Sequence, residues 1–292
     1  MQRIGIILWW FISISLVFSQ MVEEKEWENL LNLAGKSEYT RFLQAYQNMD
    51  FVLAEKTIAR IFAKQSSNIV VIFSYLFISQ YEGFGIEALE YGLYNNLLLY
   101  SKSVAQGKDG LANDLLRYVD NPRERLATLI EIESQLKYVN WLVRLEIIKE
   151  HVNRNKDYNA AMDKLSDLLT RYPNYPILHY YRLFFTLKQK DWTSFDSYAS
   201  SALKLFPRHP EILRICAQAA LERKKLQEAI AFYERGFQIN SSWHADAFVE
   251  LIKLYRENKQ NKKALEMAQK GKSLYPWKKE LGILEQQTRF GL

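Results

Sequence analysis

Apolar side chains recur three and four positions apart along much of the chain, which is the spacing of a helix with one buried face. The pattern is clearest in the second half, where it defines amphipathic segments at 158–172, 192–206, 226–240 and 261–275. Each segment follows another one after a short polar turn, and these turns lie at 153–157, 188–191, 223–225 and 257–260. Such short turns place consecutive helices side by side in opposite directions, so the second half is predicted to consist of antiparallel helix pairs.

A residue that can end a helix follows each of these segments at a regular interval. Pro173, Pro207, Ser241 and Pro276 lie 34, 34 and 35 residues apart. Proline lacks an amide hydrogen and its ring clashes with the preceding turn, so it stops a helix. The interval is that of a repeated unit of two helices.

The final unit combines large and small apolar residues in a fixed order. Its first helix carries the large residues Phe248, Leu251 and Tyr255. Its second helix carries the small residues Ala264, Ala268 and Gly271, and Pro276 closes the unit. This order resembles the tetratricopeptide repeat, in which small residues let two helices approach closely. Three preceding copies keep the order with departures, since Phe195 stands where a small residue is usual and Ser241 replaces the proline. The resemblance implies an all-α fold, an α-solenoid of antiparallel helix hairpins wound as a superhelix.

The first half keeps helical spacing but loses a clear register. Its densest apolar run, 69–78, has the composition of a buried strand, but the companion segment 86–92 resembles the second helix of a repeat, so we predict a buried helix. The segment 101–110 contains Gly107 and Gly110 and is predicted to be a surface loop or a hinge. The predicted organisation is a signal segment at 1–19, degenerate helical repeats at 20–140, four repeats at 141–278 and a capping helix at 279–292.

The chain begins with the layout of a secretory signal peptide. Arg3 supplies a positive charge, 4–18 is an apolar run, and Ser19 is a small residue at the end of the run. The run is short for a helix that spans a membrane, which needs about 20 apolar residues. We therefore expect an exported protein, periplasmic or secreted, with 4–18 as a membrane anchor if the segment is not removed.

The charge and the single cysteine change this picture little. The net charge of +6 is spread along the chain, and the densest basic stretch, 253–272, is interrupted by Glu257 and Glu266, so a solvated helical face is expected and no nucleic-acid partner. Cys216 has no second cysteine to pair with and lies in an apolar helical stripe, where a thiol acts as a small hydrophobic group.

Motifs that carry chemistry are missing from the sequence. The four histidines lie about one repeat apart and never have the spacing of a helical metal site. The sequence has neither a phosphate-binding glycine loop nor a nucleophile elbow. We therefore predict a protein that is not an enzyme, with no catalytic residue, no metal and no cofactor.

The resemblance implies that the first helix of each pair lines a concave groove. On the matching helices this groove would carry Glu146, Glu150, Tyr180, Phe184, Leu187, Arg214, Gln218, Val249, Lys253 and Arg256. Aromatic side chains beside cations suit an extended peptide with carboxylates or an amphipathic helix. The alternative is that Tyr180 and Phe184 only pack against a neighbouring helix. The set differs from the paired Lys and Asn clamp of chaperone-tail-binding members, so that ligand is not predicted.

Three functions follow from these features. The first is an exported scaffold or adaptor of the cell envelope that binds another protein or peptide of unknown identity. The second is a solute- or ligand-binding helical component of an envelope system, suggested by the aromatic content of 14%. The third is an assembly factor that stays tethered to the membrane by its uncleaved amino-terminal segment.

Overall fold

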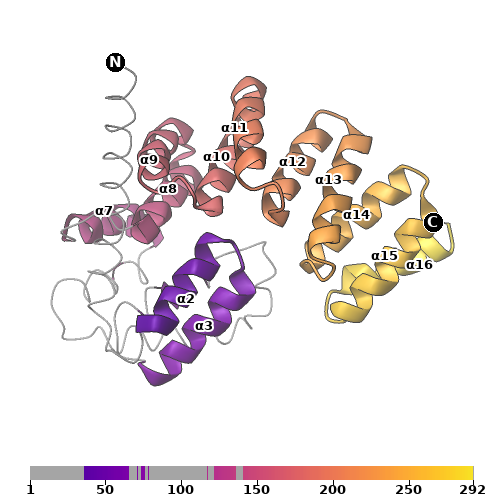
Figure 1. The fold of residues 1–292 in the computed structure, drawn as a ribbon, viewed down its shortest axis with the longest axis horizontal. Coiled ribbons are helices and arrows are strands. Elements are labelled where there is room, and N and C mark those ends of the chain that lie inside the picture. Colours follow the sequence, from indigo (N-terminus) through magenta and orange to yellow (C-terminus); the bar gives the residue numbers. More distant parts are fainter. Residues whose placement is uncertain are drawn as a thin grey trace, which may run out of the picture. The chain divides into compact units, whose positions relative to one another are not determined.

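The structure is a computed structural model and describes residues 36–65, 117, 122–135 and 141–291, together with Val71, Ser74, Tyr75 and Ile78 (Figure 1). Among these residues there are helices and turns and no β-strand. The predicted all-α fold is confirmed. The predicted signal segment and the break at 101–110 lie outside the described residues, whereas the four isolated residues of the run 69–78 are helical and buried, as expected.

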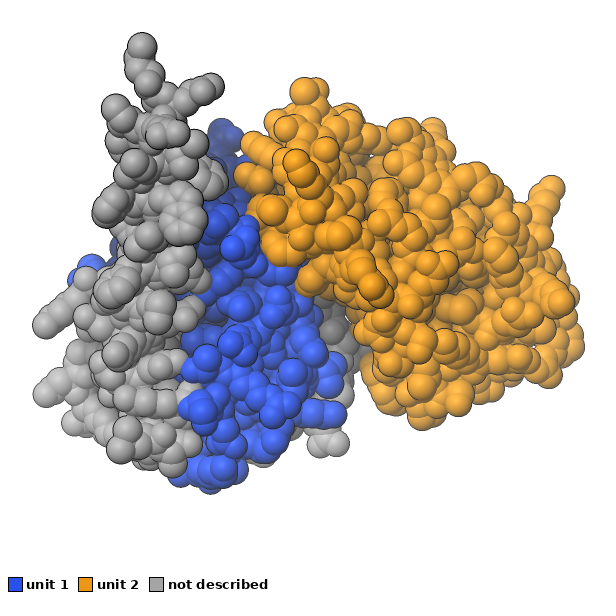
Figure 2. Space-filling view, viewed as in Figure 1, with its two compact units in different colours: residues 1–81, 88–178 blue, residues 82–87, 179–292 orange. Residues whose placement is uncertain are grey.

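The chain divides into two compact units, with the boundary between Leu178 and His179 (Figure 2). In unit 1 the described elements are α2 (Lys36–Gln47), α3 (Phe51–Lys64), η2 (Pro122–Glu124), α7 (Arg125–Gln135), α8 (Trp141–Asn155) and α9 (Tyr158–Arg171). Helix α10 (Pro176–Gln189) begins in unit 1 and continues into unit 2. The remaining elements of unit 2 are α11 (Trp192–Leu205), α12 (Pro210–Glu222), α13 (Leu226–Ile239), α14 (Ala245–Glu257), α15 (Asn261–Leu274) and α16 (Lys279–Arg289).

The second helices end one residue before the predicted ends, because the last residue of each predicted segment is a cap. The amides of Tyr172, Phe206, Asn240 and Tyr275 each donate to the carbonyl four residues earlier, over 2.7 to 2.9 Å. Proline follows three of these caps. In place of the fourth proline, the Asn240 side chain accepts from the Ser242 amide at 3.1 Å, which turns the chain by a side-chain hydrogen bond.

The turn between the two helices of a pair contains a residue in the left-handed backbone region. These residues are Met49, Lys156, Lys190, Lys224 and Lys259, with φ angles of 59°, 53°, 56°, 59° and 57°. Glycine is the usual residue at such a helix end because it has no Cβ. Asp50, Asp157 and Asp191 then cap the following helices by accepting from backbone amides. The same turn joins α2 to α3, so this hairpin of the first half has the local geometry of the repeats in the second half.

Small residues allow the paired helices of unit 2 to approach each other. Ala229, Ala264 and Ala268 are fully buried, and Gly236 and Gly271 are buried in α13 and α15. A Cβ on Gly271 would lie 2.9 Å from the Phe248 ring. Helix α16 packs against α14 and α15 and places Leu281 and Leu284 in the core that these helices share.

Candidate partner-binding face

The repeat register places corresponding residues of unit 2 on α10, α12 and α14. Tyr180, Arg214 and Val249 are equivalent because they lie 34 and 35 residues apart, and the same intervals separate Phe184, Gln218 and Lys253. We define the first-helix face as the predicted residues of unit 2, which are Tyr180, Phe184, Leu187, Arg214, Gln218, Val249, Lys253 and Arg256. Glu146 and Glu150, the other two predicted residues, lie on α8 in unit 1.

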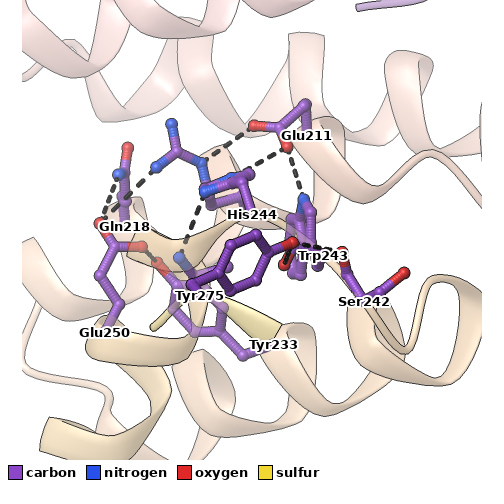
Figure 3. A network of polar contacts seen from close by, with 10 residues as sticks. Glu211, Gln218, Tyr233, Ser242, Trp243, His244, Glu250 and Tyr275 are labelled. Carbon is purple, nitrogen blue, oxygen red and sulfur yellow. Dashed lines mark hydrogen bonds and ion pairs between the residues drawn. The ribbon is translucent and has the colours of Figure 1, made fainter. Parts of the chain in front are cut away.

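A buried carboxylate, Glu211 on α12, is the centre of a polar network on this face (Figure 3). Its Oε1 atom accepts from Trp243 Nε1 at 2.6 Å and lies 3.2 Å from His244 Nε2. Its Oε2 atom accepts from Arg214 Nε at 3.0 Å. Arg214 and Glu211 are one helical turn apart, whereas Trp243 and His244 come from the loop before α14, so the carboxylate connects two consecutive repeats.

A second carboxylate, Glu250 on α14, extends the network from the other repeat. Its Oε1 atom accepts from Gln218 Nε2 at 3.4 Å and lies 3.7 Å from Arg214 Nη1. Its Oε2 atom accepts from the Tyr233 hydroxyl of α13. Arg214 therefore lies between the two carboxylates, and Figure 3 shows Gln218 and Tyr233 next to Glu250, on the other side of the network from Glu211.

The electrostatics of the network favour the charged form of its central pair. Burial by itself would raise the pKa of Glu211, but His244, Arg214 and Trp243 outweigh it and hold this pKa at about 2. Burial would lower the pKa of Arg214, but Glu211, Tyr180 and Glu250 raise it. Only 7% of the Arg214 side chain is exposed, whereas the Glu250 side chain is 31% exposed.

His244 performs two tasks at the start of α14. Its Nδ1 atom accepts from the Ala247 amide at 3.3 Å and so caps the helix. An Nδ1 atom that accepts a hydrogen bond carries no proton, so a ring proton lies on Nε2, which is 3.2 Å from Glu211 Oε1. The imidazole therefore fixes the start of α14 relative to α12.

Trp243 packs against α13 at a residue without a side chain. Its ring contacts Gly236, where a Cβ would lie 2.3 Å from Cζ3, and it lies 6.0 Å from the Tyr233 ring and 5.4 Å from the Phe237 ring. The Tyr275 hydroxyl lies 2.7 Å from the carbonyl oxygens of both Ser242 and Trp243. The loop that carries Trp243 is thus held by the contacts of the indole with α13 and Glu211, and by the contacts of its backbone carbonyls with Tyr275.

Polar contacts continue from α14 to α16. Lys253 Nζ donates to Glu280 at 2.7 Å, and Arg256 Nη1 donates to Gln287 at 2.8 Å. Lys253 keeps a side chain that is 56% exposed, and Arg256 is partly exposed. Each of these two cationic side chains therefore has a partner on α16 and is still accessible to solvent.

The aromatic residues of the face differ in exposure. The Tyr180 and Phe184 rings stack at 6.1 Å, and Lys188 Nζ lies 5.3 Å from the centre of the Phe184 ring. Tyr180 and Leu187 are buried, while Phe184 is partly exposed. Burial raises the pKa of Tyr180 although a hydrogen bond from Arg214 opposes this change. Tyr180 and Leu187 thus contribute to packing, and Phe184 keeps an accessible ring.

The structure separates the predicted residues of unit 2 into two groups. Phe184, Gln218, Lys253 and Arg256 are accessible in part, whereas Tyr180, Leu187, Arg214 and Val249 are buried. Sequence reasoning did not identify the partners of Arg214, which are Glu211 and Glu250. The signal was available, because Glu211 precedes Arg214 by one helical turn and Glu250 lies one residue beyond the repeat equivalent of Arg214.

In unit 1 the predicted residue Glu146 is buried in a network of its own. It accepts from Lys149 Nζ at 2.6 Å and from the Tyr46 hydroxyl of α2 at 3.3 Å. Burial raises its pKa, and Lys149 opposes the change. Glu150, which lies about one helical turn after Glu146, is partly exposed.

Other chemical groups of the described residues are few. Among these residues, no three His, Cys, Asp or Glu side chains form a group that could hold a metal ion. Cys216 is buried, and burial raises the pKa of its thiol to about 12, which agrees with its predicted role as a small hydrophobic residue. None of the described helices has the length and apolar character required to cross a membrane.

Comparison with known proteins identifies the fold. The chain matches no protein-family model, and it matches no curated protein. Among solved structures, yeast Tom70 is 12% identical with a TM-score of 0.60, covering 89% of this chain and 57% of that chain. A tetratricopeptide repeat protein from Parabacteroides merdae ATCC 43184 is 13% identical with a TM-score of 0.53, covering 87% of this chain and 98% of that chain. A chain of the APC/C hetero-tetramer Cut9–Hcn1 is 12% identical with a TM-score of 0.55, covering 92% of this chain and 52% of that chain. The present chain thus spans little more than half the length of the Tom70 chain and of the Cut9–Hcn1 chain, and the likeness shows a tetratricopeptide-like helical solenoid fold.

Proposed function

We propose that the chain is a non-enzymatic adaptor that binds a protein partner on the first-helix face of unit 2. The observation that carries this proposal is that Phe184, Gln218 and Lys253 occupy equivalent positions on three consecutive first helices and are all accessible. The polar network of Glu211, Arg214 and Glu250 holds the supporting helices in place before any partner arrives. A preorganised face reduces the ordering cost of binding.

The same contacts narrow the chemistry of the partner. Arg214 is buried and bound to two carboxylates, so it supports the face instead of meeting the partner. Phe184 offers an apolar surface, Gln218 an amide, and Lys253 a cation that shares Glu280. This combination suits an extended peptide or one side of an amphipathic helix that carries an apolar residue next to a carboxylate.

The test is crosslinking of the full chain to its partners in the native host, with a tag at the carboxyl end. We compare the natural chain with the double variant Phe184→Ala and Lys253→Ala, and with Lys204→Ala, which removes an exposed cation from the second helix α11. One recurrent protein that the natural chain and Lys204→Ala capture, but the double variant loses, supports the proposal. Equal capture by the folded double variant refutes it. Native mass spectrometry tests the alternative function, since a bound non-protein mass favours the component that encloses a small molecule.

We also propose that residues 1–19 export the chain to a periplasmic or extracellular location. The support is the order of Arg3, the apolar run 4–18 and Ser19. Amino-terminal sequencing of the protein recovered from cell fractions tests this proposal. A chain that starts at residue 20 outside the cytoplasm supports cleavage, an intact chain in the membrane supports an anchor, and an intact chain in the cytoplasm refutes export.

A further inference from the structure

The accessible residues of the first-helix face include a row with a regular step. We define the contact row as Phe184, Gln218 and Lys253, which lie one repeat apart on α10, α12 and α14. Side chains join the neighbouring helices of this row. Arg214 of α12 donates to the Tyr180 hydroxyl of α10, and the Glu250 carboxylate of α14 accepts from Gln218. The three first helices are therefore direct neighbours within unit 2.

The distance between neighbouring helices sets the step of the contact row. Helices in direct contact have axes about 8–10 Å apart. Two turns of an α-helix contain about seven residues and rise about 11 Å, which is close to this distance. A partner helix that lies across α10, α12 and α14 thus places residues of one of its own sides over successive positions of the row.

An extended segment does not match the same step. It rises about 3.3 Å per residue, so one step of the row takes about three residues. Side chains of an extended chain alternate between two sides, so residues three apart point in opposite directions. If the residues over Phe184 and Lys253 faced the row, the residue over Gln218 would face away from it. The step of the row therefore favours a helix.

The two ends of the contact row differ in chemistry. At α10 the Phe184 ring is partly exposed, which suits an apolar residue of the partner. At α14 the Lys253 ammonium has three hydrogen-bond donors and the Arg256 guanidinium has five, more than Glu280 and Gln287 accept. A carboxylate can accept from both cations. Because Glu257 and Glu280 border this end, a single carboxylate fits there and a generally acidic helix does not.

The middle of the contact row is bordered by carboxylates. Gln218 lies next to Glu250, whose side chain is 31% exposed (Figure 3). Glu222 lies one turn further along α12 with a side chain that is 53% exposed, and its carboxylate is 3.9 Å from Lys190 Nζ. A third carboxylate at this point would be repelled by Glu222 and Glu250. An uncharged donor such as an amide fits the middle of the row.

We propose that the partner segment is an amphipathic helix that lies across α10, α12 and α14. It places an apolar residue over Phe184, an amide over Gln218 and a carboxylate over Lys253, at intervals of about seven residues. This proposal rests on the adaptor function proposed above and deepens it, because it specifies the secondary structure of the partner and the order of its contacts.

The test measures the binding of fluorescent synthetic peptides to the full chain by anisotropy. The matched peptide is rich in alanine, is kept helical by a staple on its outer side, and carries leucine, glutamine and glutamate two turns apart. The order control exchanges the glutamine and the glutamate, so that the carboxylate is in the middle whichever way the helix lies. The extended control keeps the three side chains but contains prolines, which prevent a helix.

Variants of the chain test the two ends of the contact row. Phe184→Ala removes the apolar end, and Lys253→Glu reverses the charge of the other end. Lys270→Glu is the matched control, because it makes the same charge change at an exposed position of the second helix α15. A fourth peptide replaces the glutamate of the matched peptide with lysine. Circular dichroism checks that each variant folds and that the stapled peptides are helical.

The natural chain and Lys270→Glu should bind the matched peptide saturably, and about tenfold more tightly than the order control or the extended control. Phe184→Ala should weaken this binding about tenfold. Lys253→Glu should weaken it about fivefold and strengthen binding of the lysine peptide by a similar factor, a reversal that a structural role of Lys253 would not produce. Absence of binding by the matched peptide, equal binding by either control peptide, or no reversal in Lys253→Glu overturns the proposal.

The adaptor function and the helical partner can fail separately. If crosslinking recovers a partner that the double variant Phe184→Ala and Lys253→Ala loses, while the peptides give one of the overturning results, the adaptor function stands and the helical partner is refuted. If the folded double variant captures its partner unchanged, the adaptor function fails, and the proposed helix fails with it.

Discussion

Replacement of Gly236 by alanine tests whether the close contact with Trp243 fixes the packing between α13 and α14. An added Cβ would lie 2.3 Å from Cζ3 and 2.8 Å from Cη2 of the indole. Such distances are far inside van der Waals contact, so either the helix or the ring has to move. The ring is not free to move, because Trp243 is buried and its Nε1 atom donates to Glu211 at 2.6 Å.

The expected change in the free energy of unfolding combines one stabilising and two destabilising contributions. Alanine is favoured over glycine inside a helix by about 0.5–1 kcal/mol. Overpacking of a filled core costs about 1–3 kcal/mol. Displacement of the indole weakens a hydrogen bond to a charged group, and such a bond contributes about 1.5–3 kcal/mol. Gly236→Ala should therefore lower the free energy of unfolding by about 2–5 kcal/mol.

Gly282→Ala is the matched control, since Gly282 also lies inside a helix but an added Cβ meets no atom within 4 Å. This variant should be more stable than the natural chain by about 0.5–1 kcal/mol. Urea unfolding followed by circular dichroism and tryptophan fluorescence measures both changes. The reasoning is refuted if Gly236→Ala stabilises the chain as Gly282→Ala does, because helix propensity alone would then explain the result.

Three other substitutions test separate features. Glu211→Gln should destabilise the chain by about 3–5 kcal/mol at neutral pH, because it leaves Arg214 buried with one charged partner fewer. The folded-state pKa of Glu211 is about 2 against an ordinary value of 4.5, so its contribution is present above pH 4.5 and disappears as the pH falls through 2; urea titrations should therefore show a gap to the natural chain that narrows over this range. Trp243→Phe removes a donor to Glu211, so this pKa should rise and acid unfolding, followed by circular dichroism, should begin at a higher pH than in the natural chain. Lys224 has a φ of 59°, in the left-handed region that a residue with a Cβ adopts at a cost. Lys224→Gly should therefore stabilise the chain by about 1 kcal/mol and raise the midpoint of thermal unfolding. An unchanged or lower midpoint would contradict the assigned strain.

The sequence predicts the helices well because each one repeats a strong periodic signal. The segments 158–172 and 261–275 were placed to within one residue at their ends, since an aromatic cap and a proline mark the end of each. The left-handed residues in the turns were not predicted, because lysine is not typical of that conformation and the backbone hydrogen bonds that impose it leave no pattern in the side chains.

The polar network was harder to predict than the helices for a geometric reason. Arg214 was assigned to the correct helix, but its contacts depend on the loop 240–244, which has one more residue than the loop between α11 and α12. That extra residue brings Trp243 and His244 next to Glu211. Repeat spacing describes what the units share, so it does not predict a contact that one insertion creates.

The contacts of Glu250 have a mechanical consequence for the array. Neighbouring repeats in a solenoid touch only each other, so bending is resisted by the bonds at each junction. At the junction of α12 and α14, the guanidinium of Arg214, the amide of Gln218 and the hydroxyl of Tyr233 all contact the carboxylate of Glu250. A load that opens this junction has to separate these polar contacts together, which makes it stiffer than a junction held by sliding apolar contacts. A partner that binds across α10, α12 and α14 would therefore meet a surface that keeps its curvature under tension.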